Sequence, residues 1–139
     1  MRPRPYLRAY MAGIVVPTLF LLVIMTTYAF TIFYLGVSRQ FERPLTRAIV
    51  LPMAVVPNLW GVWNMLYLAT KSRTRLPLGV HGSLLVVVLV PTGVTLARLL
   101  DVFTMPWLVA LELVPVGMAV YYLVWKFLVG ALNHEMGIA

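Results

Sequence analysis

The chain has 139 residues, of which 62% are hydrophobic and 11% are charged. Its mean hydropathy of +0.93 is far above that of water-soluble domains, which at this composition would expose large apolar patches. The absence of cysteine excludes disulfides, thiolate metal sites, iron–sulfur clusters and cysteine nucleophiles. We therefore expect an all-α membrane protein, a single integral membrane domain over residues 1–139, without a cofactor.

Four apolar stretches predict four transmembrane helices. In chain order they cover approximately residues 10–36, 47–70, 78–100 and 107–132. Roughly 20 apolar residues span a bilayer core, so these stretches use up most of the chain and leave no room for a soluble domain. The short turn before the last stretch predicts an antiparallel hairpin. The expected fold is a four-transmembrane-helix bundle.

The basic residues predict how this bundle is oriented. Lys and Arg number seven on the side of the N-terminus, the 71–75 loop and Lys126, and four on the opposite side. The positive-inside rule then predicts that both termini lie in the cytoplasm, and we expect the membrane to be a bacterial or archaeal cell membrane. Because the first loop is also basic, an inverted topology stays open. Because the +7 net charge lies in short clusters beside apolar segments, we expect contacts with anionic lipid headgroups and no nucleic-acid partner.

A valine–proline pair occurs inside every predicted helix, at Pro17, Pro57, Pro91 and Pro115. Each proline removes an i to i−4 hydrogen bond and tends to kink its helix. Four kinks near mid-membrane would splay the helices around a cavity or provide hinges, as broken helices do in transporters. Proline is also ordinary in membrane helices, so a purely structural role is the alternative.

Glu112 is placed about two turns inside the fourth predicted helix. An ionised side chain facing lipid costs about 2.5 kcal/mol or more, so this carboxylate should face protein, pair with a cation or be protonated. We expect an ion pair with Arg98, at the end of the third helix, and a capping role for Asp101 in the turn between them. The functional alternative is a proton- or cation-coupling carboxylate.

The second predicted helix carries a group of polar and aromatic residues, which we call the polar–aromatic face: Asn58, Trp60, Trp63, Asn64 and Tyr67. Trp60, Asn64 and Tyr67 recur at i, i+4 and i+7, with Trp63 beside them. Tryptophan usually marks the headgroup level, and these two indoles lie near mid-helix, so they should face protein or a cavity. The face could hold a small ligand, a lipid tail or a quinone-like ring, or could serve only for packing and interhelical hydrogen bonds.

A metal site is not expected. His81 and His134 fall on the same side of the predicted topology, and only Glu135 could join them. Two histidines and one carboxylate without a recognisable spacing are a weak ligand set.

No nucleophile–base pair, phosphate loop or cofactor motif is present in the sequence, so an enzyme is not expected. The features above favour a channel or transporter for a small solute or ion. Because four thin helices enclose little volume, it would work as a homo-oligomer or within a larger membrane complex. The alternative is a non-catalytic accessory or scaffold subunit of a membrane complex.

Overall fold

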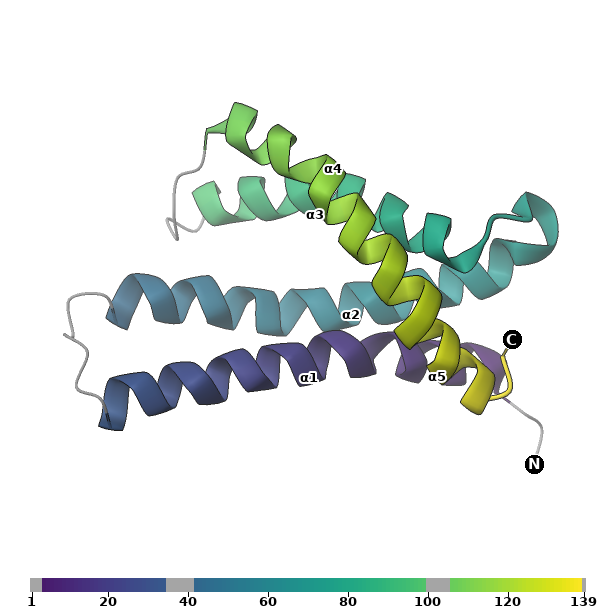
Figure 1. Cartoon of the computed structure of the whole chain (residues 1–139), viewed down its shortest axis with the longest axis horizontal. Coiled ribbons are helices and arrows are strands. Elements are labelled where there is room, and N and C mark those ends of the chain that lie inside the picture. The colour runs from purple at the N-terminus through teal and green to yellow at the C-terminus, as the bar shows by residue number, and fades with distance from the viewer. Residues whose placement is uncertain (1–3, 35–41, 100–105, 139) are drawn as a thin grey trace.

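Figure 1 shows a computed structural model of the chain, which describes residues 4–34, 42–99 and 106–138, with the side chains of 42–54 left out. Over these residues the structure is helical without strands, which confirms the predicted all-α class. The helices are α1 (Pro5–Tyr34), α2 (Glu42–Thr74), α3 (Leu78–Leu99), α4 (Trp107–Val124), η2 (Trp125–Val129) and α5 (Gly130–Glu135). The last three are consecutive, and η2 is a π-helical segment within one long helical stretch.

Three of the helical stretches extend beyond the apolar segments that predicted them, the last one to Glu135 instead of residue 132. α1 begins at Pro5 instead of residue 10, because proline is favoured in the first turn, where its missing N–H leaves no hydrogen bond unmade. α2 continues to Thr74 instead of residue 70, since Lys and Arg are good helix formers outside the membrane. It ends where Arg75 takes a positive φ of 50° and Pro77 follows.

Three helices of the described chain are long and apolar enough to cross a membrane: Pro5–Tyr34, Leu78–Leu99 and Trp107–Glu135. A fourth span, along α2, stays a prediction. Pro17, Pro91 and Pro115 lie inside α1, α3 and α4, and Pro57 lies within the bounds of α2. Whether they kink their helices also stays a prediction.

The helices form two antiparallel hairpins that diverge at one end (Figure 1). α1 and α2 run side by side over most of their length, and α3 starts beside the end of α2. α4 then crosses the bundle diagonally, so that α5 reaches the N-terminal part of α1. As a result, the N- and C-terminal ends and the turn between α2 and α3 lie at the same end of the molecule, which we call the terminal end.

Glycine allows α1 and α2 to approach closely. A Cβ atom at Gly13 would lie 2.6 Å from the backbone oxygen of Trp60, and one at Gly61 would lie 2.5 Å from the Tyr10 ring. Contacts of this length are not tolerated, so the two backbones could not keep this separation with larger residues. Small residues serve the same purpose in many membrane helix pairs, where association depends on packing.

Gly13→Ala should therefore destabilise the protein by about 1–3 kcal/mol, because its Cβ meets backbone atoms that cannot rotate away. Gly93→Ala is the matched control, since a Cβ there has open space in the same kind of helix. We expect this control to be neutral or to stabilise slightly, by removing backbone entropy. Denaturant unfolding in detergent micelles, followed by circular dichroism, measures both changes, and equal stability of the two variants would contradict the close contact.

Candidate functional site

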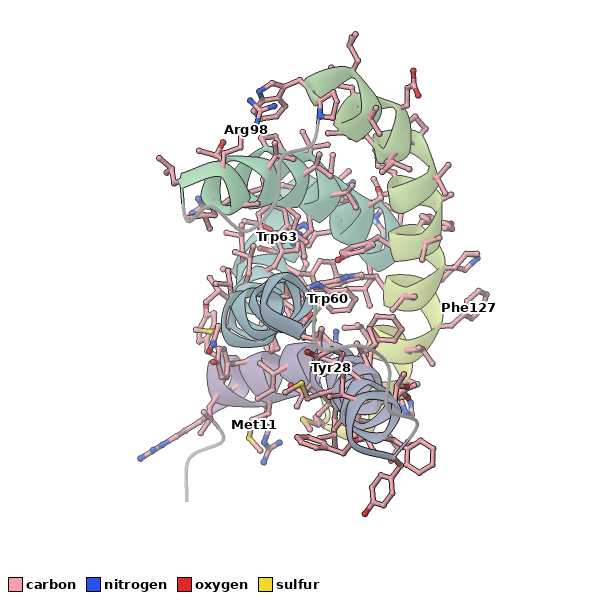
Figure 2. The ribbon with its side chains drawn as sticks, turned by 90° about the vertical axis from the view of Figure 1, so that its left-hand side faces the viewer. Met11, Tyr28, Trp60, Trp63, Arg98 and Phe127 are labelled. Carbon is pink, nitrogen blue, oxygen red and sulfur yellow. The ribbon has the colours of Figure 1, made fainter. Side chains whose placement is uncertain are left out.

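The polar–aromatic face lies on α2 and points toward the centre of the bundle. Trp60 and Asn64, one helical turn apart, are 4% and 1% exposed. Figure 2 shows Trp60 and Trp63 inside the bundle, whereas Phe127 on η2 points away from it. Tyr67 is half-buried one turn further along. The residues that the sequence grouped by helical spacing therefore lie mostly among other helices.

Asn64 is the centre of a buried amide network. Its Nδ2 donates to the backbone oxygen of Ala9 at 2.7 Å and to Oδ1 of Asn133 at 2.8 Å. The Asn133 amide returns a hydrogen bond of 3.1 Å to Oδ1 of Asn64, and Asn133 is only 3% exposed. These bonds join α1, α2 and α5. Because buried polar groups without partners are costly in hydrocarbon, this network fixes where the three helices meet.

A second reciprocal contact joins α2 to α3. The Trp63 indole Nε1 donates to the backbone oxygen of His81 at 2.8 Å, and Nε2 of His81 lies 3.1 Å from the backbone oxygen of Trp63. Since a carbonyl oxygen only accepts, this geometry requires a proton on Nε2. The His81 ring also lies 5.2 Å from the Trp63 ring and 5.3 Å from that of Tyr67, measured between centroids.

The aromatic rings continue from this contact across the bundle. Centroid distances are 6.3 Å between His81 and Trp125, 5.3 Å between Trp125 and Trp60, and 5.0 Å between Trp60 and Tyr121. Trp125 opens the π-helical segment η2 and is fully buried. It fits because Gly82 faces it: a Cβ atom at this position would overlap Cγ of the indole. The stack therefore connects α2, α3 and α4 through ring contacts.

Two indole nitrogens in this stack are buried. Neither Nε1 of Trp60 nor that of Trp125 has a partner in hydrogen-bond geometry among the described residues. The Trp60 indole nevertheless interacts with the Tyr121 side chain at its edge. The Trp125 nitrogen is therefore the less well satisfied of the two.

A cavity with a volume of about 600 Å³ lies between α1 and the α4–α5 stretch. Apolar side chains form its two long walls: Val15, Leu19 and Phe20 of α1, and Val120, Val124, Leu128, Ala131 and Leu132 opposite. Trp60 and Tyr121 close it at the centre of the bundle. We call this space the α1–α4 groove. Trp60 belongs both to this groove and to the polar–aromatic face.

Asn58 lies at a smaller cavity of about 240 Å³ between α1 and α2, together with Tyr10, Ile14 and Thr18. The Tyr10 hydroxyl donates a hydrogen bond to Oδ1 of Asn58. Unlike Asn64, Asn58 is exposed at the molecular surface. The two amides of this helix are therefore in different surroundings, one buried in a network and one at the surface.

Glu112 and Arg98 are both exposed, at the end of the bundle opposite the termini. The guanidinium of Arg98 lies over the Trp107 ring, 5.2 Å from its centroid, and the ion pair between Arg98 and Glu112 stays a prediction. This cation–π contact holds the ends of α3 and α4 together. Asp101, the predicted cap of the turn, lies outside the described residues.

The histidines do not approach one another as ligands would. His81 is buried and already bound through Nε2, whereas His134 is exposed on α5. Among the described residues no group of three His, Cys, Asp or Glu side chains could hold a metal ion.

Searches of protein-family models, curated proteins and solved structures found no match to this chain.

The amide network can be tested by a double-mutant cycle. Asn64→Leu and Asn133→Leu should each lower the free energy of unfolding by about 1–3 kcal/mol, because each leaves a buried amide without its partner. The double variant should lose less than the sum, with a coupling of about 0.6–1.7 kcal/mol. Denaturant unfolding in micelles measures the free energy of unfolding of the wild type, the two single variants and the double variant. Strictly additive losses would show that the pair is not coupled.

Proposed function

We propose that this chain is a non-catalytic accessory or scaffold subunit of a membrane complex. The observation that carries the proposal is how the interior polar groups are used. Asn64 and Asn133 bind one another, and Trp63 and His81 bind each other's backbone. A solute path needs such groups free to replace the solute's water, and here they hold helices together.

The α1–α4 groove supports the same conclusion. Its walls are apolar, so it offers no stabilisation to an ion or a polar solute crossing the bilayer. The shape of the chain is that of a packed bundle with an apolar exterior, as expected for a subunit that acts by docking.

Glu112 supports a docking site on α4. Its side chain is exposed among Leu108, Leu111 and Val116, which are also exposed. A carboxylate on an apolar helix surface is expensive in lipid unless a cation or a hydrogen-bond donor meets it. A partner protein that supplies a basic or hydroxyl-bearing residue to this surface would remove that cost.

The same observation favours one second candidate, a homo-oligomeric channel or transporter. If copies of the chain met along α4, Glu112 would line the space between them and act as the coupling carboxylate. The two functions differ in whether the purified chain alone moves a solute.

Reconstituted protein should give no proton or potassium flux above that of protein-free liposomes, and Glu112→Gln should not change this result. In native membranes, by contrast, Glu112→Gln should shift the chain from a larger complex to a smaller one on native gels. Glu135→Gln is the matched control, because Glu135 is also exposed but lies at the terminal end. Flux from wild-type protein that Glu112→Gln abolishes would overturn the accessory function in favour of the channel.

A further inference from the structure

The α1–α4 groove has the size and chemistry of a ligand site. Its volume of about 600 Å³ is within the range of roughly 300–1,000 Å³ that is usual for pockets holding small molecules. Apolar cavities do not retain water, so its occupant must be apolar. It lies along α1, a helix apolar enough to cross a membrane, and hydrocarbon chains are the surrounding solvent there.

The position of the groove along α1 suits one leaflet of a bilayer. Arg8, Val15 and Leu19 recur at i, i+7 and i+11, so they share one face of the helix. At 1.5 Å per residue the groove wall from Val15 to Phe20 lies about 10–18 Å beyond Arg8. Half of a hydrocarbon core of about 30 Å is about 15 Å. A lipid whose headgroup is level with Arg8 therefore has its acyl chain at the depth of the groove.

Arg8 lies beyond the groove, on the side of the terminal end. Its Nη1 donates to the backbone oxygen of Met136 at 3.4 Å, just beyond the α5 residues Ala131 and Leu132 that border the groove. The side chain is exposed, and a guanidinium carries five N–H donors, so several are left for another acceptor.

The surrounding charge is strongly positive. Arg4 lies one helical turn before Arg8 and is exposed, and Lys71, Arg73 and Arg75 are also at the terminal end. Among the described residues at this end the one carboxylate is Glu135. Such clusters attract anionic headgroups, each basic residue contributing about 1 kcal/mol near the surface.

We propose that the α1–α4 groove binds one acyl chain of an anionic phospholipid, whose phosphate contacts Arg8 and Arg4. The apolar walls of the groove select the acyl chain, and the arginines select the charge of the headgroup. The distance along α1 from Arg8 to the groove matches the depth of one leaflet. The site lies away from Glu112 and does not depend on the accessory function proposed above.

Native mass spectrometry tests the proposed lipid binding. The protein is reconstituted into equimolar phosphatidylglycerol and phosphatidylcholine and is then extracted into mild detergent. Wild-type protein should retain one phosphatidylglycerol in preference to phosphatidylcholine. Ala131→Phe, which fills the groove, should abolish retention, whereas Ala119→Phe, on an exposed surface of α4 outside the groove, should not. Arg8→Gln should reduce the preference for phosphatidylglycerol about fivefold, whereas Arg98→Gln, in the last turn of α3 and away from the terminal end, should leave it unchanged.

Equal retention of the two lipids by wild-type protein, or retention that Ala131→Phe leaves unchanged, would overturn the proposal. A dimer that Ala131→Phe dissociates would also overturn it, by showing that a second copy fills the groove. Circular dichroism checks that each variant folds. If Ala131→Phe does not fold, Arg8→Gln still decides the question, because it leaves the apolar walls untouched.

Discussion

The structure depends on the need to bury the polar side chains of α2 against protein. Hydrocarbon offers no water to an amide, so Asn64 can be placed in a bundle of this kind only where other helices supply its partners. It finds a backbone oxygen on α1 at Ala9 and a second amide on α5 at Asn133. These two partners come from opposite ends of the chain. To bring Asn133 to this point, the α4–α5 stretch must leave α3 and cross the bundle, as Figure 1 shows. The α1–α4 groove is the space left beside that crossing.

Close packing at glycines makes the crossing possible. Gly13 lets α1 approach α2 at Trp60, and Gly82 lets α3 accept the indole of Trp125. The two indoles then contact one another, so that the large rings fill the centre of the bundle instead of lying at the headgroup level. Each ring contact contributes about 0.5–1.5 kcal/mol of stability beyond the area that it buries. Glycine allows two helix backbones to approach more closely than larger side chains would permit. The Trp125 ring thus occupies the space that the missing side chain of Gly82 leaves, whereas Gly13 brings two backbones together.

The sequence predicted the helices well because apolar stretches of this length have few alternatives in a membrane protein. Helical spacing also placed Trp60 and Asn64 on one face, since 3.6 residues per turn fixes which side chains share a side. Asn133 could not be predicted as the partner of Asn64, because their contact depends on how far α4 tilts, and no local sequence pattern encodes a tilt. His81 was considered only as a metal ligand, although its partner is a backbone oxygen that any residue could have supplied. The π-helical turn at Trp125 is likewise a product of tertiary packing. The sequence signal that could have pointed to the amide network is Asn133 itself, an asparagine near the end of the last predicted helix.

The two features that face outward lie at opposite ends of the molecule, and this separation follows from the same crossing. Glu112 is in the second turn of α4, whereas the groove begins at Val120 and continues to Leu132. Eight residues of helix, about 12 Å, separate the carboxylate from the nearest groove wall on α4. Trp60 of α2 lines the groove, whereas Glu112 belongs to the first part of α4, in the α3–α4 hairpin, which extends away from α1 (Figure 1). An anionic lipid at the terminal end would fill the space beneath the crossing without approaching the carboxylate, whose charge would repel its headgroup. Lipid and protein partner can therefore occupy the chain together, the first supporting the tilt of α4 and the second using the surface that this tilt exposes.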